Sequence, residues 1–253
     1  MWYTGDAGDH WQKLFTDRDL DSNSIFFHSR GKFGLTINGR GPGRRRMLLA
    51  TLGSDKWIEY ELNVPGEPAS VVFQQSGAGL MTVSICDPSE VDEQRRIEKI
   101  AENDESTEIP LILPKRSLIF ATESERLEWT ELSSIDSWIS NLLTTDKATF
   151  AYGHDGIYRS LDYGQSWSQT QIELPEGVSV NSITSVDDLM VAVGDFGYLA
   201  FSDDNGETWK NCSLEARGEH YIAASPSGSD LIVVGCRHIR RVRLQAGYAR
   251  RLV

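Results

Sequence analysis

Two stretches of this 253-residue chain align with each other: GHDGIYRSLDYGQSW at residues 153–167 and GDFGYLAFSDDNGETW at residues 194–209. Both end in the pattern Ser-x-Asp-x-Gly-x-Ser/Thr-Trp, and the two tryptophans lie 42 residues apart. A Ser or Asp at the head of a tight turn accepts hydrogen bonds from nearby backbone N–H groups. The Gly supplies a positive φ, and the Trp lays a large apolar ring against the turn. The pattern therefore predicts a hairpin tip between two short strands.

A third copy of this pattern stands at residues 4–11, and degenerate copies stand at residues 52–57, 122–129 and 245–248. The three good copies supply the residues that we expect to build structural tips. These residues are Thr4, Asp6, Gly8, Trp11, Ser160, Asp162, Gly164, Trp167, Ser202, Asp204, Gly206 and Trp209. The tryptophans of these tips lie at positions 11, 57, 129, 167 and 209, and Arg250 takes the equivalent position in the last tip, so the intervals are 46, 72, 38, 42 and 41 residues.

A period of about 40 residues is typical of four short strands per repeat, which is one blade of a β-propeller. The tip pattern resembles the Asp-box, also called the bacterial neuraminidase repeat. We therefore expect an all-β fold: a β-propeller of about five to six four-stranded blades with Asp-box hairpin tips, formed by residues 1–253 as a single domain.

The strands can be placed between the tips. One blade is expected at residues 182–186, 189–194, 198–202 and 208–212, the preceding one at 138–145, 148–153, 157–161 and 166–171, and another within 24–60. The 72-residue interval leaves room for an insertion at residues 87–110. Ile97, Ile100 and Ala101 have helical spacing in it, which predicts a charged surface helix.

The two ends of the chain leave two arrangements open. In the favoured one, a partial N-terminal blade at residues 1–14 completes the blade begun by strands at 221–225 and 231–236. The ring then closes with five blades and displaces residues 238–253 as a basic C-terminal segment. In the other, the C-terminal blade is complete, and the N-terminal half-blade takes two strands from another chain.

Charge is unevenly spread along the chain. The net charge is −12, which disfavours nonspecific nucleic-acid binding, yet residues 238–253 hold five arginines and no acid. This asymmetry suggests that the C-terminus meets an acidic surface, such as that of a sister chain; a solvated edge protected by arginine is the alternative. The candidate partner-binding residues are Arg44, Arg45, Arg46, Arg240, Arg241, Arg243, Arg250 and Arg251.

Catalytic and metal-binding patterns are not found in the sequence. The five histidines have no mutual metal spacing, and nothing indicates a cofactor. Sialidases share the Asp-box, but they also have an early Arg-Ile-Pro segment; the nearest string here is Glu108-Ile109-Pro110. We therefore expect no enzyme, with a sialidase-like glycosidase as the less favoured alternative.

The favoured function is a non-catalytic interaction module with protein partners in a larger assembly, similar to small propellers of bacteriophage tails and baseplates. An alternative is a carbohydrate-binding propeller that recognises surface glycans through Tyr152, Tyr158, Phe196 and Tyr198. A third alternative is a photosystem assembly factor of the Asp-box type; these factors share the repeat but resemble longer, seven-bladed chains with a targeting leader, and neither feature is seen in this sequence. No apolar run long enough for a membrane span and no signal peptide are seen, so a cytoplasmic or virion location is expected.

Overall fold

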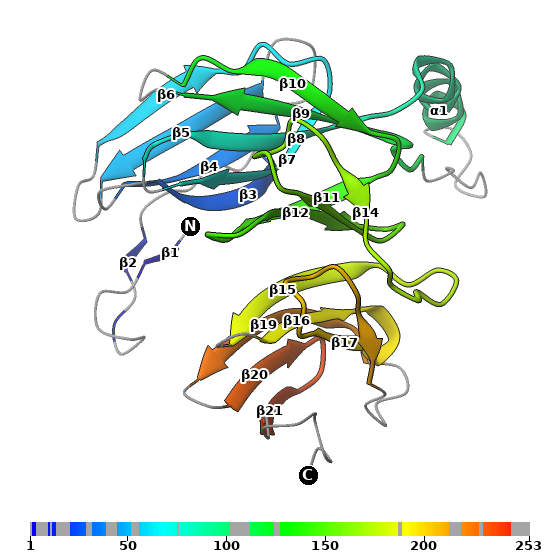
Figure 1. Cartoon of the computed structure of the whole chain (residues 1–253). Helices are drawn as coiled ribbons and strands as arrows, with labels where there is room; N and C mark the ends of the chain where they lie inside the picture. Colours follow the sequence, from blue (N-terminus) through cyan, green and yellow to red (C-terminus); the bar gives the residue numbers. More distant parts are fainter. Residues whose placement is uncertain are drawn as a thin grey trace.

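The computed structural model consists of antiparallel sheets that follow one another along the chain (Figure 1). It describes residues 2–3, 10, 12–13, 21–28, 32–38, 45–51, 56–74, 76–101, 112–123, 127–186, 189–212, 219–227 and 230–243. In every sheet each strand pairs with the next strand in sequence.

Five sheets contain three or four strands each. The first contains β3 (Asp21–His28), β4 (Lys32–Asn38), β5 (Arg45–Thr51) and β6 (Trp57–Glu61). The second contains β7 (Glu67–Phe73), β8 (Gly79–Ile85), β9 (Arg116–Thr122) and β10 (Thr130–Ile135). The third contains β11 (Ile139–Thr144), β12 (Thr149–Gly153), β13 (Ile157–Ser160) and β14 (Ser168–Gln169). The fourth contains β15 (Val180–Val186), β16 (Leu189–Gly194), β17 (Leu199–Ser202) and β18 (Lys210–Asn211), and the fifth contains β19 (Tyr221–Ser227), β20 (Asp230–Gly235) and β21 (Ile239–Arg243).

Among the described residues, the hydrophobic core is divided into four clusters, one between each pair of consecutive sheets. Met81 and Phe26 belong to the cluster between the first and second sheets, and Ile119 and Ala151 to the next. Further clusters fill the spaces between the third and fourth and between the fourth and fifth sheets. The sheets therefore pack face to face in chain order, as propeller blades do.

The second strands of the second, third and fourth sheets are buried on both faces, which explains their sequences. All five residues of β12, TFAYG, are buried, with Phe150 facing the fourth sheet and Ala151 facing the second. A strand covered on both faces has an almost continuous apolar run instead of an alternating one. The expected strands of the third and fourth sheets are confirmed, with ends that differ by a few residues from those expected.

One helix, α1 (Pro88–Ala101), interrupts the second sheet between β8 and β9. It lies within the expected insertion at residues 87–110. Asp87 precedes it and accepts a hydrogen bond from the backbone N–H of Ser89, while Pro88 occupies the first helical position. Its charged residues pair along the exposed surface, as Asp92 does with Arg95 and Glu93 with Arg96.

The favoured arrangement of the chain ends is wrong at the C-terminus. Residues 239–243 are not displaced: β21 pairs with β20 along its whole length, from Asp230 opposite Arg243 to Val234 opposite Ile239. Val242 is buried in the core, and β20 gains a partner on its second edge. The N-terminal strands β1 (Trp2–Tyr3) and β2 (Gln12–Lys13) form a two-stranded sheet of their own.

No helix in the described ranges is both long and apolar enough to span a membrane.

Candidate functional site

The two described tip motifs have the same hydrogen-bond network. In the fourth sheet, the Ser202 hydroxyl accepts from the backbone N–H of Gly206 (2.8 Å) and donates to Asp204 (2.7 Å). In the third sheet, Ser160 makes the same bonds to Gly164 (2.7 Å) and Asp162 (2.7 Å). Both glycines have positive φ, +75° and +87°. In each motif the indole N–H of the Trp donates to the carbonyl of that glycine.

The aspartates of these motifs are held as carboxylates. The side-chain and backbone hydrogen bonds from Ser166, followed by that from Ser160, lower the pKa of Asp162 to about 2. Burial acts to raise the pKa of Asp204, but hydrogen bonds from Thr208, Ser202 and Glu207 outweigh it and lower that pKa to about 2.

Each tip packs against the preceding sheet, so the tips join neighbouring sheets. Gly206 lies so close to the ring of Phe150 that a Cβ at this position would overlap the ring. Gly164 lies beside Leu80, and the phenol of the neighbouring Tyr163 donates to the carbonyl of Ala78. The third predicted tip, Thr4, Asp6, Gly8 and Trp11, lies outside the described residues.

The arginines that the sequence offered for partner binding are partly engaged within the chain. Arg45 donates to the carbonyl of Val64 (3.1 Å), and Arg46 pairs with Glu59 across the first sheet (2.7 Å). Arg241 pairs with the buried carboxylate of Asp230 (2.6 Å). Arg240 lies half-buried in β21, and Arg243 ends that strand. Arg44, Arg250 and Arg251 lie outside the described residues.

A second set of loops lies at the opposite end of the sheets, where each second strand connects to the third. We call this end the α1 face, because α1 forms this connection in the second sheet. In the last three sheets, the backbone N–H after the second strand donates to the carbonyl just before the first strand. These bonds are His154 N to Trp138 O (3.2 Å), Asp195 N to Ser179 O (3.1 Å) and Cys236 N to His220 O (3.1 Å).

Polar side chains link these loops from one sheet to the next. His154 of the third sheet contacts the Ser179 hydroxyl of the fourth (3.2 Å). Asp195 of the fourth sheet accepts from His220 of the fifth (3.1 Å). Burial acts to raise the pKa of Asp195, but the hydrogen bonds from Asn181, His220 and the Ser179 backbone lower it. The Asp195 carboxylate is therefore held charged and in a fixed orientation by groups of the fourth and fifth sheets.

Phe196 is the most unusual residue of the α1 face. Its side chain is 59% exposed, and its ring lies 4.7 Å from the ring of His220. It has a left-handed φ of +53°, followed by Gly197 at +76°, in the short turn η1 (Asp195–Gly197). Positive φ at both central residues is typical of a type I′ hairpin turn, where Asn-Gly is preferred. A bulky aromatic in this conformation is strained by about 1 kcal/mol or more.

The four aromatics considered for glycan binding do not form one exposed platform. Tyr152 and Tyr198 are buried, at 6% and 8% exposure, and Tyr158 is half-buried. Tyr152 and Tyr198 belong to the core between the third and fourth sheets, because both faces of these sheets are covered. Of this set only Phe196 faces solvent, so the expectation of an aromatic platform is wrong.

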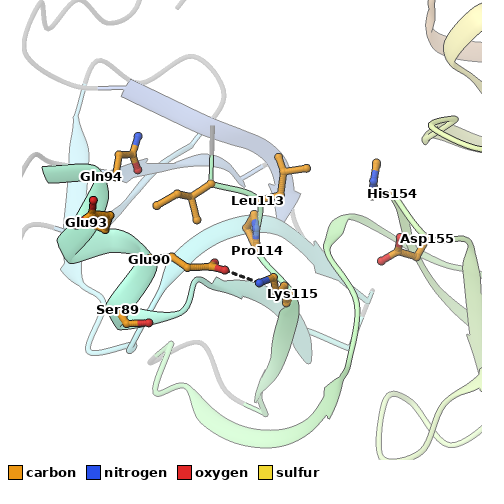
Figure 2. A pocket seen from close by; sticks show the side chains of 10 residues that line it. Ser89, Glu90, Glu93, Gln94, Leu113, Pro114, Lys115, His154 and Asp155 are labelled. Carbon is orange, nitrogen blue, oxygen red and sulfur yellow. Dashed lines mark hydrogen bonds and ion pairs between the residues drawn. The ribbon is translucent and has the colours of Figure 1, made fainter. Parts of the chain in front are cut away.

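A pocket of about 700 Å³ opens beside α1 (Figure 2). α1 forms one wall, residues 112–115 form another, and His154 and Asp155 face them from the β12–β13 connection. The ion pair between Glu90 and Lys115 joins the first two walls. Asp155 accepts from the Ser137 hydroxyl (2.9 Å). Sequence reasoning missed this pocket, because nothing in the pattern brings residues 88–94 to the β12–β13 connection.

No group of three or more His, Cys, Asp or Glu side chains in the described ranges is arranged to hold a metal ion. The three cysteines do not pair with one another: Cys86 and Cys212 are half-buried and Cys236 is exposed.

Comparison with known proteins identifies the fold and nothing finer. No protein-family model matches the chain, and no curated protein matches its sequence. Among solved structures, "YCF48 bound to D1 peptide" is similar with a TM-score of 0.59 at 16% identity, over 92% of this chain and 67% of that one. The propeller of Dos1 is similar with a TM-score of 0.55 at 11% identity, over 92% of this chain and 58% of that one.

A third similar structure is a nidogen/laminin complex, with a TM-score of 0.58 at 11% identity over 92% of this chain and 80% of that one. At such identities the likenesses show the fold alone. Together with the succession of antiparallel sheets, they show that this chain folds as a multi-blade β-propeller.

Proposed function

We propose that this β-propeller is a non-catalytic interaction module that binds a protein partner through the α1 face. The two described tip motifs support kinship with Asp-box propellers. Their role in joining neighbouring sheets supports a structural function for them, which leaves the α1 face for recognition. The repeat type and the uneven charge support placing the chain in a larger assembly such as a phage tail or baseplate, in the cytoplasm or the virion.

Phe196 is the observation that carries the proposal. Asparagine would fit a left-handed φ before Gly197 with less strain, and a polar residue would suit the exposed position better. The chain instead has a large apolar ring at this position, which packs beside the ring of His220. Asp195 in turn accepts a hydrogen bond from His220. Exposed aromatics on a rigid support are typical of the residues that dominate protein interfaces. Because folding does not require an aromatic residue in this strained conformation, the strain at Phe196 favours a binding role for this residue.

Two of the similar structures agree with this use of the fold. YCF48 was solved with a D1 peptide bound, and nidogen in a complex with laminin. These are properties of those proteins; they support the proposal because they show propellers of related shape serving as protein-binding modules. A protein partner at the α1 face is therefore the interaction that we propose here.

The proposal is tested with Phe196→Asn and a matched control, Leu161→Asn. Leu161 is also an exposed apolar residue, at 70%, but it lies in the tip motif at the opposite end of the third sheet. Tagged chains are expressed in the cells that naturally contain the protein, and the bound proteins are quantified by mass spectrometry. We expect Phe196→Asn to lose the partners that wild type retains, while Leu161→Asn keeps them.

Stability separates this result from misfolding. Phe196→Asn relieves the backbone strain, so the free energy of unfolding should stay the same or rise by about 1 kcal/mol. Partners that remain bound to Phe196→Asn but leave Leu161→Asn would contradict the proposal and point to the tip end of the sheets.

A further inference from the structure

We propose that the pocket beside α1 binds the C-terminal segment, residues 244–253, of a second copy of this chain. The inference rests on the proposed function in taking the α1 face as the contact surface. It goes further in naming one occupant of that face and the chemistry that recognises it.

The pocket combines an apolar wall with carboxylates. Ile112, Leu113 and Pro114 supply the apolar wall, and Asp155 stands opposite (Figure 2). Asp155 is exposed, and in the described part of the chain the polar partner of its carboxylate is the Ser137 hydroxyl and not a cation. Glu93 adds a second carboxylate on α1, shared with the exposed Arg96. A ligand with arginine beside apolar residues would pair with both features.

Residues 244–253 have this chemistry. They read Leu-Gln-Ala-Gly-Tyr-Ala-Arg-Arg-Leu-Val, with Arg250 and Arg251 next to Leu252 and Val253 and no acid in the segment. Because the whole chain carries a net charge of −12 while this segment carries two arginines and no acid, electrostatic attraction favours contact between the segment and a second copy. The guanidinium groups can pair with Asp155 and Glu93, while Leu252 and Val253 cover the apolar wall.

The position of the segment favours a second copy over the same molecule. β21, from which the segment continues, and α1 lie at opposite ends of the molecule (Figure 1). A contact between one copy's segment and another copy's pocket is heterologous, so it generates a ring or a filament. Such growth suits a protein that works inside a larger assembly.

A synthetic peptide tests the pocket directly. The probe is acetyl-LQAGYARRLV-amide with a fluorescent label, titrated with chain truncated after Arg243, and binding is followed by fluorescence anisotropy at low salt. The truncation leaves β21 and all its pairs with β20 in place. We expect saturable binding that weakens as salt rises, and loss of binding when both arginines of the peptide are replaced by serine.

Variants of the pocket locate the site. Asp155→Asn and Glu93→Gln together should weaken peptide binding by about fivefold or more, since each removes a charge that faces the arginines. Glu98→Gln is the control, because Glu98 is an exposed carboxylate of the same helix that does not line the pocket. Equal affinities of the double variant and the control would overturn the proposed site.

Solution mass tests the association itself. By size-exclusion chromatography with light scattering, the full chain should exceed the monomer mass of 28.3 kDa as concentration rises. Both the truncated chain and Arg250→Ser/Arg251→Ser should remain monomeric. A full chain that stays monomeric at every concentration, or peptide that does not bind, overturns this inference. Neither result affects the partner loss expected of Phe196→Asn, so the two proposals fail separately.

Discussion

Asp204 accepts hydrogen bonds from the backbone N–H groups of Glu207 and Thr208 while its other contacts reach Ser202. One carboxylate thus satisfies several donors of a turn that has no strand partner for them. The following Gly206 lets the turn approach Phe150, which is fully buried. At the scale of the residue, the tip motif therefore closes a turn by hydrogen bonds and allows it to pack against the neighbouring sheet.

Gly206→Ala should therefore be costly. A Cβ there meets two penalties: a φ of +75° and overlap with the ring of Phe150. Together they should lower the free energy of unfolding by about 3 kcal/mol. Gly177 is the control, since it also has a φ of +75° but no atom lies within 4 Å of the added Cβ. Gly177→Ala should cost only about 1 kcal/mol. If Gly206→Ala and Gly177→Ala lowered the free energy of unfolding equally in urea, the close contact between the tip and Phe150 would be contradicted.

The residues of the two described tips could be predicted from sequence, because their chemistry is local. Ser, Asp, Gly and Trp act within eight residues of one another, so their spacing carries the information. The orientation of Tyr152, Tyr198 and Phe196 could not be predicted in this way. In strands covered on both faces, alternation does not distinguish inside from outside, and the exposure of Phe196 depends on a turn conformation that aromatic residues rarely adopt.

At the scale of the element, β21 shows why the C-terminal prediction failed. The strand reads Ile-Arg-Arg-Val-Arg, and the favoured arrangement displaced it because residues 1–14 were expected to complete the sheet of residues 221–225 and 231–236. Yet Val242 is 1% exposed, and Arg241 neutralises the buried Asp230 at the start of β20. The buried Val242 and the pairing with β20 therefore hold this strand in the sheet, where the N-terminal strands were expected. The helix within residues 87–110 was easier to anticipate, because its apolar spacing and charge pattern are local.

α1 gives a prediction at this scale, because Asp87 caps the helix that forms one wall of the pocket. Asp87→Ala removes the acceptor for the Ser89 backbone N–H and should destabilise the helix by about 1 kcal/mol. Amide hydrogen exchange of residues 89–101 should accelerate accordingly. Asp92→Ala, which breaks only the exposed pair with Arg95, serves as the control and should have a much smaller effect. If both variants exchange alike, the cap does not hold α1 in place.

At the scale of the whole molecule, the chain has the fold of solved propellers to which it is only 11% to 16% identical in sequence. This is expected where the fold depends on buried strands and well-formed turns and not on particular side chains. The same reason limits what the fold says about function, since function depends on the residues placed on it. In this propeller the tips join one sheet to the next. The opposite end has the exposed Phe196, the polar contacts between sheets and the pocket beside α1.

The measurement that tests this division most directly is hydrogen–deuterium exchange of the chain alone and in complex with its native partner. The account predicts protection on binding at residues 88–101, 154–157 and 195–198, all on the α1 face, with residues 161–167 and 203–209 unchanged. Protection confined to residues 161–167 and 203–209 would contradict it, because partners would then contact the tips and not the α1 face.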